Sequence, residues 1–305
     1  MRHFKDNVSF GQYSGILLLI LSCFFTSCEK EIQVTLASTP PQLVVQGSIE
    51  NGQPPLVFLT TSIGFFSKVD ISDIQNIFVH DAVITVSDGT RTTKLREYSI
   101  DTANGSRFSV YSVDTSNIAN LLLGELGRQY SLTITTGGKT YTSVTTIPFP
   151  KALDTLWFGP PSFARPSTPK NALELFGNYT DPDTPGNYVR YFTKRNNDAF
   201  YPGGLFSDEL VNGKKINNID LFAGTNDTGS FRDDSLLYFY PGDSVTLKWS
   251  EIDKGVYNFW NTYQFALQSG GNPFSSPINV KTNITNGALG VWAGYGTVYS
   301  RLLVR

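Results

Sequence analysis

The chain has 305 residues, and its 24 basic and 26 acidic residues give a formal net charge of −2. This balance argues against a nucleic-acid partner, which needs a clustered basic surface. Aromatic residues make up 13% of the chain and methionine occurs once, a composition that favours β-sheets over helix bundles.

The N-terminus has the pattern of an export signal. Arg2 and Lys5 precede an apolar run over residues 15–25, which is shorter than the roughly 20 apolar residues that cross a bilayer. Two small residues then precede Cys28 and charged residues follow it, as in a lipobox. We therefore predict a lipoprotein signal peptide over residues 1–27 and lipidation of Cys28.

Other uses of this segment stay open. The signal could be cut near Ser27 without lipidation, or be kept as a short anchor. Cys23 is a rival lipidation site, although its use would truncate the apolar run. Cys23 and Cys28 are the only cysteines, so a mature chain that begins at Cys28 forms no internal disulfide. Residues 28–41 are expected to form a polar, lipidated tether.

Residues 42–147 have the pattern of a β-sandwich of the immunoglobulin-like or fibronectin-like kind. Apolar and polar residues alternate over 82–87, and Asp88-Gly89 is a strong hairpin signal because both positions tolerate positive φ. Tyr130 lies in a segment similar to a tyrosine corner, where a phenol hydroxyl bonds to upstream backbone; alternatively it is simply a core aromatic. Further strands are expected at 42–49, 56–60, 90–95, 107–110, 130–136 and 139–147.

A Pro-rich linker over 148–170, with one strand at 153–158, is predicted to precede a β-rich α+β domain over 171–305. Its strands are expected at 172–179, 187–193, 236–249 and 288–304, whereas the polar stretch 198–234 is expected to form long loops. One amphipathic helix is predicted over about 251–268. Ser250 is expected to cap its first turn, with Asp253 in support.

The chain beyond the predicted signal peptide has too few histidines for most histidine-based sites. His80 is the only histidine beyond residue 3, which excludes a His-rich zinc site, a Cys–His dyad and two-His iron. His80 lacks a Gly-x-Ser-x-Gly elbow as partner, so it is expected to be a surface or hydrogen-bonded histidine. We therefore expect no cofactor and no catalytic residue.

Carboxylate pairs occur at Asp181/Asp183 and Asp233/Asp234. Both pairs lie among turn-forming residues, so turns are the favoured interpretation, and acid/base work is the alternative. Asp181, Asp183 and Asn187 are also a weak calcium candidate, although the spacing lacks the glycine and terminal glutamate of an EF-hand loop.

Tryptophans and short acceptor motifs suggest two roles for sugars. Trp157, Trp249, Trp260 and Trp292 could form a carbohydrate platform, but core positions are the favoured interpretation. Asp-Ser/Thr-aliphatic triplets resemble periplasmic O-glycosylation acceptors. They predict modification of at least one of Thr102, Thr155, Ser235 and Ser244.

Short segments spread over nearly the full length carry a family resemblance. They are Cys28–Ile32, Leu43–Gly52, Ala82–Gly89, Gly127–Tyr130, Asp181-Pro182, Asn187–Tyr191, Gly270–Phe274, Asn283-Ile284 and Gly287–Gly290. In order and spacing they resemble Bacteroidota surface lipoproteins of the domain-of-unknown-function 4249 family. The resemblance implies an envelope lipoprotein, often encoded near TonB-dependent transporters, and brings no catalytic residues. The acidic segment after Cys28 also looks like the tag that exports such lipoproteins to the outer face.

These observations lead to one expected function and two alternatives. We expect a non-enzymatic, lipid-anchored outer-membrane protein at the cell surface that captures a ligand or serves as an accessory or lid of a TonB-dependent transporter. Its partners would then be the outer-membrane bilayer and that β-barrel, and not nucleic acid. The alternatives are an envelope glycan hydrolase that uses carboxylates of the C-terminal domain, and a structural adhesin.

Overall fold

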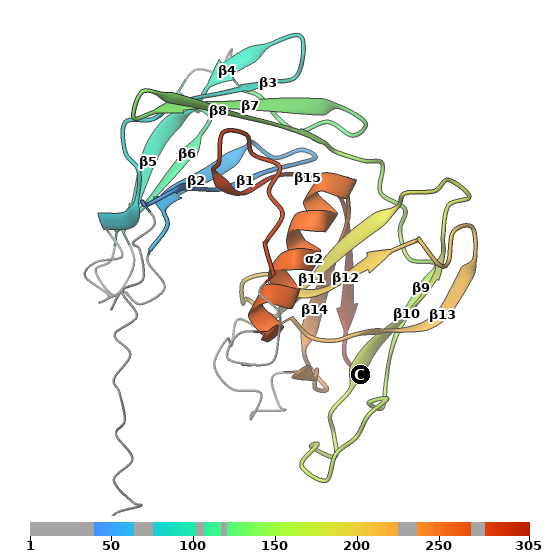
Figure 1. Cartoon of the computed structure of the whole chain (residues 1–305). Coiled ribbons are helices and arrows are strands. Elements are labelled where there is room, and N and C mark those ends of the chain that lie inside the picture. The colour runs from blue at the N-terminus through green and yellow to red at the C-terminus, as the bar shows by residue number, and fades with distance from the viewer. Residues whose placement is uncertain (1–39, 64–75, 102–106, 117–120, 225–236, 270–277) are drawn as a thin grey trace, which may run out of the picture. The chain divides into compact units, whose positions relative to one another are not determined.

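Strands dominate the part of the chain that the computed structural model describes, which comprises residues 40–63, 76–101, 107–116, 121–224, 237–269 and 278–305. The elements are shown in Figure 1. They are β1 (Leu43–Glu50), β2 (Leu56–Thr61), β3 (Val83–Ser87), β4 (Thr92–Lys94), β5 (Arg96–Asp101), β6 (Arg107–Ser112), β7 (Gln129–Thr136), β8 (Lys139–Thr146), β9 (Thr155–Gly159), β10 (Glu174–Thr180), β11 (Tyr188–Arg195), β12 (Tyr201–Ser207), β13 (Lys215–Leu221), β14 (Ser244–Ile252), α2 (Lys254–Ser269) and β15 (Leu289–Leu303). The expected mainly β fold with one helix is confirmed.

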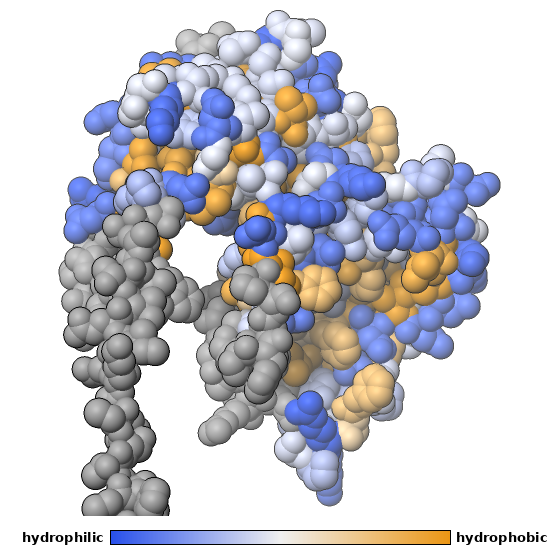
Figure 2. Space-filling view, in the orientation of Figure 1, coloured by the Kyte–Doolittle hydropathy of each residue, from blue (hydrophilic) through white to orange (hydrophobic). Residues whose placement is uncertain are grey.

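The first sandwich, formed by the N-terminal strands, packs a four-stranded sheet against part of an eight-stranded one. The four strands run in the order β4-β3-β7-β8, and the facing layer contains β1, β2, β6 and β5. Val45, Ile84, Leu132 and Trp292 lie in the shared apolar core. Buried and exposed residues alternate along β8, and Figure 2 shows mostly hydrophilic and neutral residues over the top of this sandwich. Period-two alternation therefore fixes which face of these strands is buried.

Tyr130 forms the expected corner of the first sandwich. Its side chain is fully buried, and its hydroxyl donates to the carbonyl of Leu123 at 3.2 Å while accepting from the N–H of Glu125 at 2.8 Å. The Tyr130 carbonyl in turn accepts the indole N–H of Trp292 at 3.0 Å. The predicted bond from the phenol to upstream backbone is confirmed, and it also fixes Trp292 in the core.

The second sandwich packs β13-β10-β9 against the β12-β11-β14-β15 end of the large sheet. The prediction that residues 198–234 form long loops is wrong for β12 and β13. Gly203 explains why β12 is hard to recognise, because a Cβ built there would lie 2.0 Å from Cε2 of Tyr191. Glycine lowers strand propensity, yet this contact requires it.

Strand β15 belongs to both sandwiches. Its first half pairs in parallel with β1, with Val44 opposite Leu289, and its second half pairs antiparallel with β14. At the start of β15, Gly290 has φ +102, and a Cβ there would lie 1.9 Å from the carbonyl oxygen of Val45. One sheet thus takes strands from both sides of the boundary predicted near residue 148. The division into domains 42–147 and 171–305 stays a prediction.

The helix begins later than predicted. Ser250, the expected cap, lies in β14, is fully buried and shares a 2.8 Å hydrogen bond with the Thr297 hydroxyl. Asp253 caps α2 instead, since its Oδ1 accepts the N–H of Val256 at 2.9 Å. Its Oδ2 accepts the Thr145 hydroxyl at 2.6 Å, which ties the helix start to the end of β8. The correction places Glu251 in a strand rather than in a helix.

A buried arginine holds α2 on the sheet. The Arg190 guanidinium lies 3.4 Å from the ring centre of Trp260 and 4.8 Å from that of Phe192. Tyr295 accepts hydrogen bonds from Arg190 at 3.3 Å and from the Trp260 indole at 3.1 Å. Burial lowers the pKa of Arg190. Among the described residues, no carboxylate forms an ion pair with Arg190. The cation–π contacts with Trp260 and Phe192 therefore stabilise its charge.

Candidate functional site

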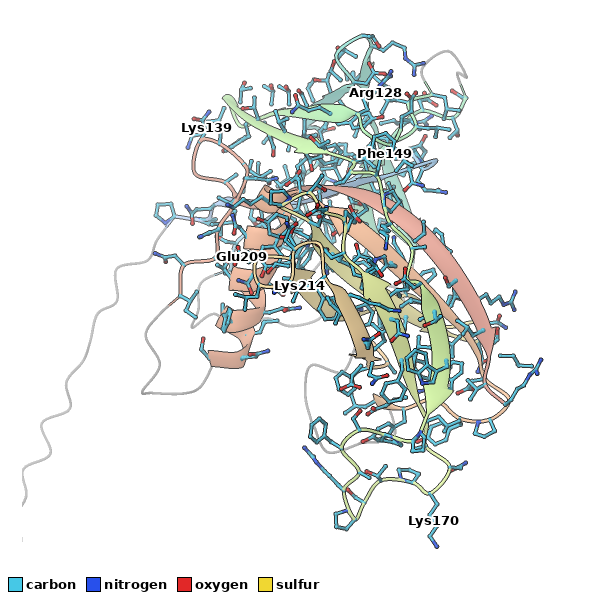
Figure 3. All side chains as sticks on the ribbon, turned by 90° about the vertical axis from the view of Figure 1, so that its right-hand side faces the viewer. Arg128, Lys139, Phe149, Lys170, Glu209 and Lys214 are labelled. Atoms are coloured by element: carbon cyan, nitrogen blue, oxygen red, sulfur yellow. The ribbon has the colours of Figure 1, made fainter. Side chains whose placement is uncertain are left out.

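A pocket of about 420 Å³ lies at one end of the second sandwich, between its two sheets. Its walls come from the end of β10, the start of β11, the end of β12, the start of β13 and the second half of β14. The loop 208–214 lies at this end, and Figure 3 labels Glu209 and Lys214 in it. The volume is in the range typical of small-molecule sites.

Aromatic side chains form the inner wall of the pocket. The ring centre of Trp249 lies 5.5 Å from that of Tyr179 and 5.8 Å from that of Phe206. Tyr191 stacks behind Trp249 at 6.3 Å. Trp249 is only 2% exposed, so this wall is part of the packed core of the second sandwich.

Two carboxylates lie on the polar side of the pocket. Asp181, at the end of β10, accepts the N–H of Gly213 at 3.0 Å through Oδ2. Asp208, at the end of β12, accepts the N–H groups of Gly186 and Asn187 at 2.7 and 2.9 Å, also through Oδ2. No described residue donates a hydrogen bond to Oδ1 of either carboxylate. Each acid is thus held by backbone and keeps one oxygen for another partner.

Glu251 extends the acidic group behind the aromatic wall. It is 4% exposed, and its Oε1 accepts the backbone N–H of Lys151 at 3.0 Å and the Tyr179 hydroxyl at 3.5 Å. Glu251 also lines a neighbouring, more open hollow of about 610 Å³. Asp208 lines both spaces, so it forms part of the wall that they share.

The surroundings of Asp181 and Glu251 disfavour the charged forms of these two side chains. Burial raises the pKa of Asp181, against the opposing N–H of Gly213, and the negative charge of Asp208 adds to the rise. Burial also raises the pKa of Glu251, to which the charge of Asp181 adds. Lys151 is the cation that faces both acids and opposes these shifts, but its ammonium is already shared with Asp154 and the Thr180 carbonyl.

Two polar atoms of pocket-lining residues lack partners among the described residues. They are the indole Nε1 of Trp249, a donor, and Oδ1 of Asn187, an acceptor. A buried polar atom without a hydrogen bond costs roughly 1–3 kcal/mol. A ligand that supplies an acceptor and a donor would recover this free energy.

Comparison with known protein families matches residues 29–301 to the family described as Domain of unknown function (DUF4249). The chain belongs to this family. No curated protein matches it. Among the described residues of this DUF4249 chain, no helix is long and apolar enough to cross a membrane.

The calcium candidate is only partly assembled in this DUF4249 chain. Asp181 and Asn187 line the same pocket, whereas Asp183 is exposed beside Gly213 and does not line it. The described residues contain no group of three or more His, Cys, Asp or Glu side chains placed to hold a metal ion. The pocket thus offers a cation the carboxylates of Asp181 and Asp208, which are fewer ligands than a calcium ion needs.

The candidate modification sites divide into two groups. Cys28, Thr102 and Ser235 lie outside the described residues, as do the predicted signal peptide 1–27, residues 28–39 of the predicted tether, and the pair Asp233/Asp234. Thr155 is exposed on β9, at the edge of its sheet. Ser244 is half-buried, and its Oγ accepts a hydrogen bond from Arg301 at 3.0 Å. Lipidation and glycosylation stay predictions, with Thr155 the better-placed acceptor of these two.

His80 makes a hydrogen bond but has the wrong geometry for a triad. Its Nδ1 lies 2.5 Å from Oε1 of Glu97, and the Ser109 hydroxyl donates to the same oxygen. Because Glu97 lies between serine and histidine, His80 cannot take a proton from Ser109. The expectation of a hydrogen-bonded surface histidine is confirmed.

The four tryptophans lie in different places. Trp292 is in the first core, Trp249 in the second, Trp260 is on α2, and Trp157 stacks on Phe176 at 5.9 Å. They do not share one platform. The pocket residues that the sequence did not reveal are Tyr179, Phe206 and Asp208, because they meet only through pairing of distant strands.

Proposed function

We propose that this chain is a non-enzymatic lipoprotein, anchored through Cys28 to the outer membrane at the cell surface, that captures a small ligand for a TonB-dependent transporter. The observation that carries the proposal is the pocket in the second sandwich. It combines a buried aromatic wall, carboxylates with a spare oxygen, and an unpartnered indole N–H. Such a mixture of apolar area and few convergent polar groups is typical of ligand sites.

The anchor is tested by mass spectrometry of the N-terminal peptide from native membranes. We expect cleavage before Cys28 and a diacyl or triacyl mass on this residue. A Cys28→Ala variant should lack the acylated N-terminal peptide, and an unmodified wild-type peptide would contradict the anchor. Protease shaving of intact cells then tests exposure at the surface.

The partner is tested by affinity purification of the full chain from gently solubilised native membranes. We expect a TonB-dependent β-barrel to copurify with the wild type. The Cys28→Ala variant is the control, because it keeps the folded sandwiches and loses the proposed location. Recovery of the lipidated chain without any such barrel would contradict the transporter role and leave the pocket to be explained otherwise.

A glycan hydrolase is the second candidate, and one observation favours it. Burial raises the pKa of both Asp181 and Glu251, and the charge of Asp208 adds to the first shift and that of Asp181 to the second, as expected for a general acid. The test is release of reducing sugars from envelope and host glycans. Activity that Glu251→Gln abolishes and Asp183→Asn preserves would establish this reading over ligand capture.

A further inference from the structure

The charged side chains that line the pocket in the second sandwich are all acidic. Asp181, Asp208 and Glu209 line it, and no lysine or arginine is among the lining residues that the structure describes. Lys151 approaches from behind, with its ammonium 4.9 Å from the ring centre of Tyr179 and bonded to groups outside the pocket. The space therefore presents negative charge to an incoming molecule.

Asp181 and Asp208 each have one carboxylate oxygen available to a ligand. Oδ2 of Asp181 and of Asp208 accepts backbone N–H groups, and Oδ1 of each accepts none from a described residue. The two acids are near enough for the charge of Asp208 to act on Asp181. Two like charges held near each other by backbone bonds are stabilised when a cation enters between them.

The aromatic wall supports the same kind of ligand. Trp249, Tyr179 and Phe206 line the apolar part of the pocket. The ring centres of Tyr179 and Phe206 lie 5.5 and 5.8 Å from that of Trp249. Ring faces attract alkylammonium groups and also bury apolar carbon. A ligand with both parts would use both sides of this space.

The two polar atoms without hydrogen-bond partners further restrict the chemistry of the ligand. Trp249 is 2% exposed, and its Nε1 can only donate a hydrogen bond. A ligand must therefore carry an acceptor atom to pair with it. Oδ1 of Asn187 can only accept, and an ammonium group supplies donors for it. The pocket thus selects a cation that also carries an oxygen or similar acceptor.

Resting on the proposed capture function, we propose that this pocket binds a small amphipathic organic cation. Its ammonium group lies between Asp181 and Asp208, and its apolar body lies against Trp249, Tyr179 and Phe206. A hydroxyl or carbonyl accepts the indole N–H. A bare divalent ion fits less well, because it would leave the aromatic wall and the indole unused. A neutral sugar would leave two carboxylates unneutralised.

Isothermal titration of the full-length chain with four matched probes tests this. Tyramine carries the ammonium, the ring and a hydroxyl; tyrosol replaces the ammonium by a neutral hydroxyl; 4-hydroxyphenylacetate replaces it by an anion; and phenethylamine lacks the ring hydroxyl. We expect tyramine to bind at least about tenfold more tightly than tyrosol. The anion should not bind, and phenethylamine should bind more weakly than tyramine.

Variants assign the binding to the pocket. Asp181→Asn should remove most of the preference for tyramine over tyrosol, whereas Asp183→Asn, in the same loop but outside the pocket, should keep it. Trp249→Phe should remove the preference for tyramine over phenethylamine and keep that over tyrosol. Thermal unfolding of each variant confirms that it is folded.

The proton balance gives a second readout. Tyramine binding near pH 5 should release protons, seen as a dependence of the measured heat on buffer ionisation enthalpy, because a bound cation favours the ionised acids. Equal binding of tyramine and tyrosol, or loss of tyramine binding in Asp183→Asn, would overturn the inference. So would the absence of tyramine binding at millimolar concentration. Copurification with a transporter would then still support capture of a different ligand.

Discussion

Asp88 in the first sandwich and Asp181 in the second are buried to nearly the same degree, at 8% and 6% exposure. Asp88 accepts hydrogen bonds from the N–H and hydroxyl of Thr90 and from the N–H of Arg91, at 2.7 to 2.9 Å, and lies 3.1 Å from the Arg128 guanidinium. Asp181 accepts one bond, from Gly213. Two carboxylates with nearly the same exposed fraction therefore accept very different numbers of hydrogen bonds from the protein.

This difference reverses the sign of the pKa shift. Burial opposes ionisation of Asp88, but the bonds from Arg91 and Thr90 and the charge of Arg128 outweigh it, so the pKa of Asp88 falls well below its usual range. For Asp181 burial outweighs one bond and the pKa rises. The additional donors and the arginine around Asp88 therefore contribute to the opposite signs of the two shifts.

The largest expected effect comes from Asp88→Ala. Losing the bonds that close the β3–β4 hairpin leaves several donors unpaired, so the free energy of unfolding should fall by about 2–4 kcal/mol. Urea unfolding measures this, with Asp101→Ala as the control, because Asp101 is an exposed acid that, among the described residues, pairs with Arg107 alone, at 2.8 Å. Equal effects of the two substitutions would mean that the donors around Asp88 contribute nothing special.

Glu251→Gln should act in the opposite direction. The folded state raises the pKa of Glu251, so neutralising this side chain removes a penalty and should stabilise the apo protein by about 1 kcal/mol at pH 7. The gain should shrink towards pH 4, where the wild-type side chain is itself protonated. Glu209→Gln, an exposed acid of the same hollow, is the control. A destabilised Glu251→Gln variant would show that this charge is well compensated.

The smallest effect, and the sharpest test of the comparison, is local pH dependence in hydrogen exchange. As pH falls from 7 towards 4, Asp181 and Glu251 take up protons more readily folded than unfolded, so protection of β10 and β14 should rise. Below about pH 4 the lowered pKa of Asp88 reverses the sign: its contribution is lost, and protection of β3 and β4 should fall first. Parallel changes in both sandwiches would remove the distinction.

Local chemistry made much of the first sandwich predictable. Alternation over 82–87, the Asp88-Gly89 turn and the Tyr130 corner each depend on neighbours in sequence, and each is found in the structure. The strand β12 was missed because Pro202, Gly203 and Gly204 read as a loop. Only the ring of Tyr191, on the neighbouring strand, explains those glycines.

The pocket was harder to predict for a related reason. Asp181 directly follows β10, Asp208 directly follows β12 and Trp249 lies in β14, so the three meet only after these strands take their places in two sheets. The error at Ser250 shows the limit of short-range rules, since both Ser250 and Asp253 fit a cap and only Asp253 reaches the N–H of Val256. A residue's role in the site is decided by partners far away in sequence.

The shared strand β15 also has a consequence for folding kinetics. Val44 and Leu289 pair across almost the whole described chain, so neither sandwich is closed until the last strand arrives. Such high contact order slows folding and leaves the edges of β1 and β14 open meanwhile. Chaperones that shield open strand edges should therefore bind this chain until β15 pairs with β1 and β14.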